Sequence, residues 1–150
     1  MERKLEPAAT SHNRAAFDGA KVALFVGERL VIMRRDDRPD IDYPGLLDFP
    51  GGGREGDETP LETVVRETRE EVGLRLTEAD MVWRRDFVSV SAPGWTVWFY
   101  VARLSASAEA DIVLGDEGQG WELMTPHSFL SRSDAVPSLQ HRLAVWLNGR

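Results

Sequence analysis

The sequence predicts a single α/β domain in which helices pack on a mixed β-sheet. Its 150 residues are about the length of one domain, and 42% are hydrophobic and 29% charged, as in ordinary globular proteins. Strand-like runs outnumber helical segments along the chain, and two helical segments carry clear signals. Strands with few helices between them form a mixed sheet on which those helices pack.

The N-terminal third is expected to hold an arm, a hairpin and a loop. Residues 1–18 show no apolar period, so we expect a loosely ordered arm before a single domain over residues 19–150. Two β-rich runs, 21–26 and 29–35, are separated by Gly27-Glu28, which is typical of a hairpin with glycine at its first turn position. Prolines and aspartates then predict a loop that leads into a short apolar stretch at 46–49.

A glycine-rich segment and a helix follow. Residues 50–58 are expected to form no regular element because of their glycines. Thr59 and Glu62 make a capping box, a proline occupies the first helical position, and Gly73 is placed to end the helix in a left-handed turn. These signals predict a helix over residues 60–72.

The second half of the chain is expected to add strands and a terminal helix. Runs 82–90 and 95–104 flank Ala92-Pro93-Gly94, which predicts a second hairpin, and 112–114 and 121–124 are shorter strand candidates. An apolar stripe at i, i+4, i+7 and i+8 predicts an amphipathic helix at the C-terminal end and comprises Leu139, Leu143, Trp146 and Leu147.

Charge and cysteine content narrow the function. The 18 lysines and arginines against 25 aspartates and glutamates give a net charge of −7, which disfavours nucleic acid as a partner. An anionic substrate would need another source of positive charge. The absence of cysteine excludes disulfides, thiolate zinc sites and cysteine nucleophiles, and it fits the cytoplasm. No run approaches the roughly 18 apolar residues of a membrane helix, so we expect no membrane partner.

The predicted helix carries a cluster of glutamates beside its apolar face. At 100° per residue that face comprises Leu61, Val64, Val65, Thr68 and Val72. Glu67 and Glu71 border it, and Glu70 lies on the neighbouring arc. Like charges at i, i+4 cost a helix about 0.2 to 0.5 kcal/mol, a penalty that a bound cation would reverse. Taken alone, the cluster is more typical of a solvated charged face, because charge runs on helices are common.

The glycines allow two other interpretations, and neither fits. Gly51, Gly53 and Gly56 satisfy G-x-G-x-x-G, but a dinucleotide fold needs its helix to begin within the motif, and residues 57–60 intervene here. A P-loop requires lysine where Asp57 stands.

The glycine loop and the acidic helix together form one continuous pattern. Gly52 is followed by five residues, then Glu58, seven residues and the run Arg66-Glu67-Thr68-Arg69-Glu70-Glu71-Val72-Gly73-Leu74. This pattern resembles the Nudix box, G-x5-E-x7-R-E-U-x-E-E-x-G-U, where U is a bulky aliphatic residue. Thr68 departs from the aliphatic residue expected there, Asp57 from a frequent glycine, and Leu47 from a frequent tryptophan. The resemblance implies a Nudix-type α/β/α sandwich with a mixed β-sheet.

The resemblance also implies a metal site. By position, Glu67, Glu70 and Glu71 would bind Mg²⁺, with Mn²⁺ as a substitute, and Gly52 would add its backbone carbonyl. Oxygen-only ligands suit Mg²⁺, which shares its remaining positions with waters and substrate phosphates. An acidic protein would thus hold an anionic substrate through its metal.

Three further residues receive roles from the same resemblance. Arg66 would orient a neighbouring carboxylate, and Glu58 would brace the loop against the helix. The catalytic residues implied are therefore Glu67, Glu70, Glu71, Arg66 and Glu117. The general base is either a glutamate of the box or Glu117, which stands in a later loop where similar enzymes often place a carboxylate.

The implied activity is Mg²⁺-dependent hydrolysis of a nucleoside diphosphate linked to another group. A nucleoside triphosphate is the leading substrate, giving a nucleoside monophosphate and pyrophosphate. The proline marker of ADP-ribose enzymes is absent, since Ser89 and Val90 stand there, and so is the coenzyme A signature. The alternatives are a non-catalytic nucleotide-binding or regulatory module, whose glutamates would be broken, and an isomerase, which the short cysteine-free chain disfavours. Dimers are common in the family, so a homodimer is also open.

Other side chains give weaker signals. Arg34 and Arg35 end a strand that similar enzymes use near phosphates. Five strand aromatics could stack on a purine but are more often core, namely Trp83, Phe87, Trp95, Trp98 and Tyr100. The histidines show no ligand spacing and are interpreted as structural; they are His12, His127 and His141.

Overall fold

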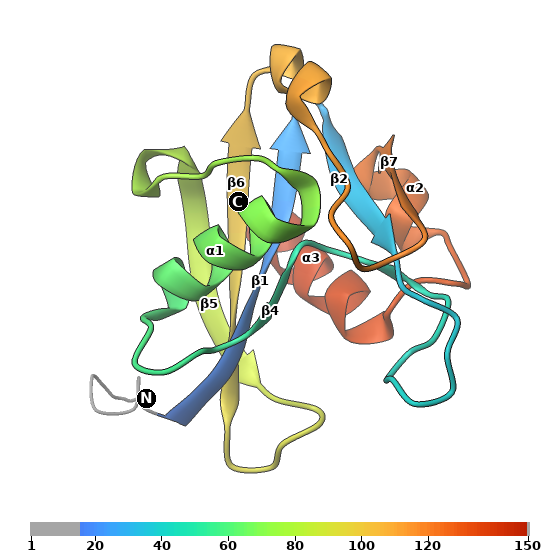
Figure 1. Ribbon diagram of the computed structural model, residues 1–150. Helices are drawn as coiled ribbons and strands as arrows, with labels where there is room; N and C mark the ends of the chain where they lie inside the picture. The colour runs from blue at the N-terminus through green and yellow to red at the C-terminus, as the bar shows by residue number, and fades with distance from the viewer. Residues whose placement is uncertain (1–15, 150) are drawn as a thin grey trace.

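Seven strands form one mixed sheet at the centre of residues 16–149, the part of the chain that the structure describes (Figure 1). In this computed structural model the strands are β1 (Phe17–Val26), β2 (Arg29–Arg34), β3 (Leu47–Asp48), β4 (Gly51–Gly53), β5 (Met81–Val88), β6 (Thr96–Leu104) and β7 (Gly120–Met124). Their order is β3-β2-β1-β6-β5, with β4 also paired with β1 and β7 with β2. β1 and β6 are parallel, and the other named pairs are antiparallel.

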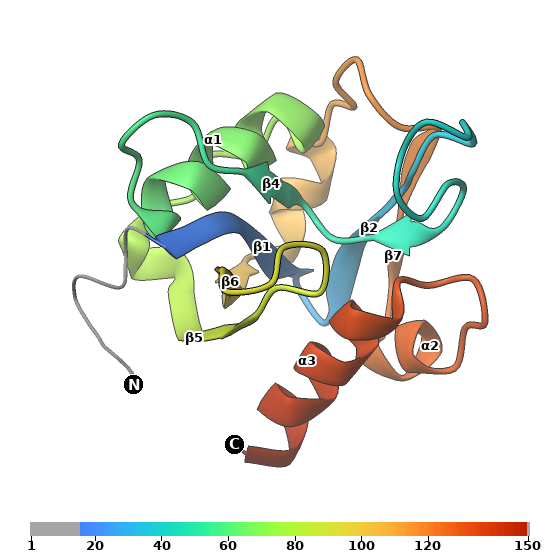
Figure 2. The same ribbon diagram turned by 90° about the horizontal axis from the view of Figure 1, so that it is seen from below.

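Helices cover both faces of the sheet and give three layers (Figure 2). The helices are α1 (Pro60–Val72), α2 (Pro126–Leu130) and α3 (Pro137–Gly149), with 3-10 turns η2 (Glu78–Asp80) and η3 (Ala106–Asp111). One core cluster contains Val64 and Val72 of α1, and the other contains Phe129 of α2 and Leu143 of α3. The predicted α/β/α sandwich with a mixed sheet is confirmed.

Elements with strong local signals lie where the sequence predicts them. α1 begins after Thr59, whose side chain accepts from the Glu62 N–H, and it ends at Gly73 with φ 75°. The β1–β2 and β5–β6 hairpins are both antiparallel, and Gly27 has the positive φ of 65° that its turn requires. The predicted terminal helix is α3.

Two predictions about local structure are wrong. Within 50–58, residues Gly51–Gly53 form the short strand β4, because a glycine backbone can approach β1 so closely that a Cβ at Gly51 would overlap the Ala20 carbonyl. Residues 112–114 form no strand. Their segment instead caps the end of α1, since the Val113 N–H donates to the Val72 carbonyl at 2.9 Å and the Gly115 N–H to the Glu71 carbonyl at 2.8 Å.

The predicted N-terminal arm, 1–18, lies almost entirely outside the described residues. β1 already begins at Phe17, which pairs with Thr96 of β6. Within residues 16–149, no helix has the length and hydropathy needed to cross a bilayer.

Candidate functional site

The site is built where α1 faces the glycine strand β4. Val64, Thr68 and Val72 are buried against the sheet, which fixes the rotation of α1 about its axis. Glu67 and Glu71 consequently lie half-buried at the edge of the helix that adjoins β4. Gly52 has no side chain to separate the two elements: a Cβ there would lie 2.7 Å from the Glu67 carboxylate.

Arg66 ties the loop before α1 to the acidic face of the helix. Its Nε donates to Glu58 at 2.6 Å and its Nη2 donates to the Gly53 carbonyl at 2.9 Å. Its Nη1 donates to Glu67 at 3.1 Å and to Glu70 at 3.3 Å. The hydrogen bond from Arg66 is the main reason that the pKa of Glu58 falls to about 2. The same hydrogen bond raises the pKa of Arg66.

Glu71 is the most perturbed carboxyl of the site. Burial raises its pKa to about 8, against the opposing effects of Lys21 and of the Gly51 N–H, which donates to Glu71 Oε1 at 2.9 Å. The nearby carboxyls of Glu67 and Asp48 raise the pKa further. The site therefore disfavours a negative charge on Glu71 unless a cation enters.

A second charged network supports the other side of the glycine strand. Asp48 is only 5% exposed, and its Oδ2 accepts from Lys21 Nζ at 3.0 Å and from Arg35 Nη1 at 2.8 Å. Lys21 also donates to the carbonyls of Phe49 and Gly51, at 3.2 Å each. The sequence analysis did not single out Lys21 or Asp48. Each is a charged residue in an otherwise apolar run, which is the signal that could have identified it.

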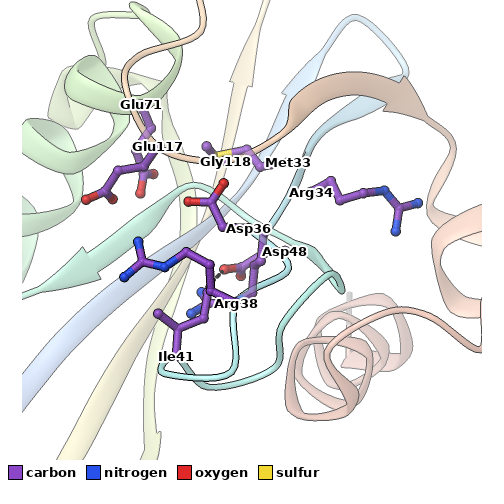
Figure 3. Close-up of a pocket in the computed structure, with 10 residues that line it drawn as sticks. Met33, Arg34, Asp36, Arg38, Ile41, Asp48, Glu71, Glu117 and Gly118 are labelled. Carbon is purple, nitrogen blue, oxygen red and sulfur yellow. Dashed lines mark hydrogen bonds and ion pairs between the residues drawn. The ribbon is translucent and has the colours of Figure 1, made fainter.

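Three neighbouring cavities meet at these residues. The first, of about 470 Å³, is lined by Glu55, Glu67, Glu70, Glu71, Gly115, Asp116 and Glu117. The second, of about 160 Å³, shares Glu71 and Glu117 with the first and adds residues of the loop after β2 (Figure 3). The third, of about 320 Å³, shares Arg35 and Asp48 with the second and runs on to α3. Through their shared residues, the three cavities connect the glutamates of α1 with α3 on the other face of the sheet.

The donor set fits a hard divalent cation, although the glutamates are not arranged as a finished metal site. All the candidate ligands are oxygens, and Glu71 is a buried carboxyl beside Glu67. Among residues 16–149, no three acidic or histidine side chains are grouped so as to hold an ion as they stand. Arg66 Nη1 donates to one oxygen of Glu67 and one of Glu70, which leaves the second oxygen of each carboxylate available to a cation.

The structure brings the predicted acids together. Glu67, Glu70, Glu71 and Glu117 line one cavity, although they come from α1 and from the loop before β7. Gly52 lines the third cavity and lies against Glu67, and Arg66 bridges Glu58 to Glu67.

Other predicted contacts are distributed differently. Arg35 lines the second and third cavities. Arg34 also lines the second, but its guanidinium points away from Glu71 and Glu117, and it donates to the Gly45 carbonyl at 2.7 Å and to Asp134 at 3.2 Å (Figure 3). Four of the five aromatics pack against the cores, and Trp95 is exposed. His12 lies outside the described residues. Tyr43 and Arg142, which sequence reasoning missed, line the third cavity.

Comparisons with known proteins agree on this fold. A family model described as the NUDIX domain matches residues 17–145. The MutT protein from Methanosarcina mazei Go1 has 19% identity and a TM-score of 0.68, over 88% of this chain and 94% of that one. A C. elegans Ap4A hydrolase has 18% identity and a TM-score of 0.64, over 88% and 99%. A bifunctional NMN adenylyltransferase/ADP ribose pyrophosphatase from Francisella tularensis has 16% identity and a TM-score of 0.63, over 91% and 42%. No curated protein sequence matches significantly.

Proposed function

The chain belongs to the Nudix hydrolases, enzymes that act on nucleoside diphosphate derivatives, and on this basis we propose that it is a nucleoside triphosphate pyrophosphohydrolase. It releases a nucleoside monophosphate and pyrophosphate, and it requires Mg²⁺, with Mn²⁺ as a substitute. The observation that carries the proposal is the meeting of Glu67, Glu70, Glu71 and Glu117 in one cavity, which the second cavity links to the partly apolar third one.

Three glutamates of α1 and one carbonyl hold the metal in this proposal. Glu67, Glu70 and Glu71 supply carboxylate oxygens, and Gly52 supplies its backbone oxygen. When bound, the divalent ion provides the positive charge that stabilises phosphate oxygens and polarises the attacking water. Lys21 and Arg35, which meet at Asp48, bring further positive charge close to the path between the cavities.

Glu117 is the general base in this proposal. It lines the same cavity as Glu71, and no described residue forms an ion pair or hydrogen bond with its carboxylate. Glu71, by contrast, accepts a hydrogen bond from the Gly51 N–H. Glu117 takes a proton from the water as the water oxygen attacks phosphorus and the anhydride P–O bond breaks, with the electron pair leaving on the phosphate oxygen.

The third cavity suits the nucleoside. Its volume of about 320 Å³ and its apolar residues match the usual sites of small ligands. The apolar lining comes from the sheet, the loop before β6 and the start of α3, and it includes Val90, Val97, Val136 and Leu139. A substrate whose phosphates lie near Gly52 and Lys21 would place its base toward α3.

A substrate panel tests the proposal. The protein is incubated with the common nucleoside triphosphates, ADP-ribose, a dinucleoside polyphosphate and coenzyme A, with Mg²⁺, with Mn²⁺ and with EDTA. Release of a monophosphate and pyrophosphate from a triphosphate, abolished by EDTA and by Glu67→Gln, is expected. Hydrolysis of no triphosphate, or hydrolysis that persists in EDTA, contradicts the proposal. A cytoplasmic location, a homodimer and the lack of a nucleic-acid partner stay predictions from the sequence.

A further inference from the structure

Arg142 is a buried cation that the chemistry described so far does not use. It follows the apolar stripe of α3, three residues after Leu139, and is only 6% exposed. Its guanidinium stacks over the Phe87 ring at 5.3 Å and makes one long hydrogen bond, from Nη2 to the Val88 carbonyl at 3.5 Å. Among residues 16–149, no carboxylate pairs with it.

Such a group is costly unless something pairs with it. A guanidinium carries five N–H donors in a planar fork, and a single 3.5 Å bond leaves most of them unmatched. Burial lowers the pKa of Arg142, in keeping with the absence of a carboxylate partner. Because a buried charge is normally paired, the structure points to a ligand that supplies acceptors.

Arg142 lines the third cavity, which extends to it from Gly52 and Lys21 by way of Ser138. A nucleotide whose phosphates lie at the Lys21 end would bring its base to Arg142. In this orientation Arg142 would donate its hydrogen bonds to the edge of the base and not to a phosphate.

A strained aromatic residue lines the same cavity. Tyr43 has φ 51°, the only positive φ of a non-glycine residue in the described part of the chain. Bulky residues adopt this conformation rarely, and such outliers cluster at ligand sites. Two hydrogen bonds hold the backbone around Tyr43: Arg35 Nε donates to the Asp42 carbonyl at 2.8 Å, and Arg34 Nη1 donates to the Gly45 carbonyl. Tyr43 thus lines the cavity from a fixed loop, and its aromatic ring is a candidate stacking surface for a base.

We propose that Arg142 selects a 6-oxopurine, the base of guanine and hypoxanthine nucleotides, by donating two hydrogen bonds to its O6 and N7 atoms. Arginine pairs in this way with guanine, whereas adenine presents an amino donor where O6 stands and so opposes the guanidinium. Asp42, which lines the same cavity, offers an acceptor for the N1–H group next to O6, which both bases carry. This inference rests on the proposed function, since it assumes that the phosphates lie toward the glutamates.

The experiment measures binding without hydrolysis. Dissociation constants of GMP, IMP, AMP, CMP and 7-deaza-GMP are determined in EDTA, for the unaltered protein and for Arg142→Gln. GMP and IMP should bind the unaltered protein about 10- to 100-fold more tightly than AMP, and 7-deaza-GMP, which lacks the N7 acceptor, more weakly than GMP. Arg142→Gln should remove this preference and leave AMP binding within about twofold.

A matched variant controls for the loss of a ring-stacked arginine. Arg103 lies over the Phe25 ring at 4.5 Å but is exposed and lines none of the three cavities. Arg103→Gln should keep the preference for GMP.

Four outcomes overturn the inference: equal binding of GMP and AMP, equal binding of GMP and 7-deaza-GMP, tighter binding of CMP than of GMP, or a uniform loss of all nucleotides in Arg142→Gln. Each of these is readable even if no triphosphate is hydrolysed, so a failure of the proposed function is recognised separately.

Discussion

Replacing Glu71 by glutamine should stabilise the metal-free protein while removing most of its activity. The folded state raises the pKa of Glu71 from 4.5 to about 8 by burial, so at pH 7 the carboxyl must take up a proton on folding. Glutamine is neutral, has nearly the same shape and can still accept from the Gly51 N–H. It should therefore keep the structure without the cost of protonation.

The magnitude follows from the pH. A raised pKa means that the stability is greatest below pH 4.5 and is lost as the pH rises to about 8. Each pH unit above 4.5 costs about 1.4 kcal/mol, so the gain from Glu71→Gln should be near zero at pH 4.5 and about 3 kcal/mol at pH 7. The turnover should fall about 10²- to 10⁴-fold at the same time, because a ligand of the metal is lost.

Urea unfolding in EDTA at pH 4.5 and pH 7 measures the first effect. Glu70→Gln is the matched control: Glu70 lies one residue away, its side chain is 54% exposed, and its ion pair with Arg66 at 3.3 Å should contribute less than about 1 kcal/mol at either pH. If Glu71→Gln is no more stable than the unaltered protein at pH 7, or if its gain does not depend on pH, the reasoning about the buried carboxyl is refuted.

Three further predictions concern the neighbours of Glu71. Gly52→Ala should weaken Mn²⁺ binding at least about 10-fold, because its Cβ would lie 2.7 Å from the Glu67 carboxylate, whereas Gly53→Ala, whose nearest neighbour would be the Asp18 carbonyl at 3.9 Å, should bind normally. Equal binding by the two variants would show that Glu67 can move aside. Glu58→Gln should lower the free energy of unfolding by about 2 kcal/mol at pH 7, and by less as the pH falls from 4.5 toward 2, because Arg66 stabilises only the ionised carboxylate. Urea unfolding across this pH range measures the difference between the two proteins. A difference that does not change with pH would contradict the prediction. Glu117→Gln should lower kcat about 10²- to 10⁴-fold with KM little changed. Asp116→Asn, which alters the adjacent acid of the same cavity, should keep kcat within about threefold. If steady-state kinetics show the same fall in kcat for both variants, Glu117 is not the base.

Local signals account for what could be predicted from the sequence. The capping box at Thr59 and the left-handed Gly73 act within a few residues of the helix that they delimit, so the bounds of α1 follow from the chain alone. The glutamates could be placed for the same reason, since the rotation of α1 is set by its own apolar face. The spacing of the Nudix pattern then identified the family that the domain match shows.

Features that depend on distant partners could not be predicted. β4 is a strand only because β1 lies beside its glycines, and the segment after Ile112 is drawn to the end of α1 rather than to the sheet. Asp48 meets Lys21 and Arg35 from different strands, and Arg142 meets the third cavity from the last helix. No periodicity in a single segment contains that information.

Calorimetric titration with Mn²⁺ at pH 7 tests the metal site most directly. Because Glu71 is largely protonated there in the metal-free state, binding should release about one proton, which titrations in two buffers of different ionisation enthalpy detect. Glu71→Gln should bind at least about 10-fold more weakly and release no such proton. Absence of any heat of binding, with or without a nucleotide present, would contradict the assignment of these glutamates as metal ligands.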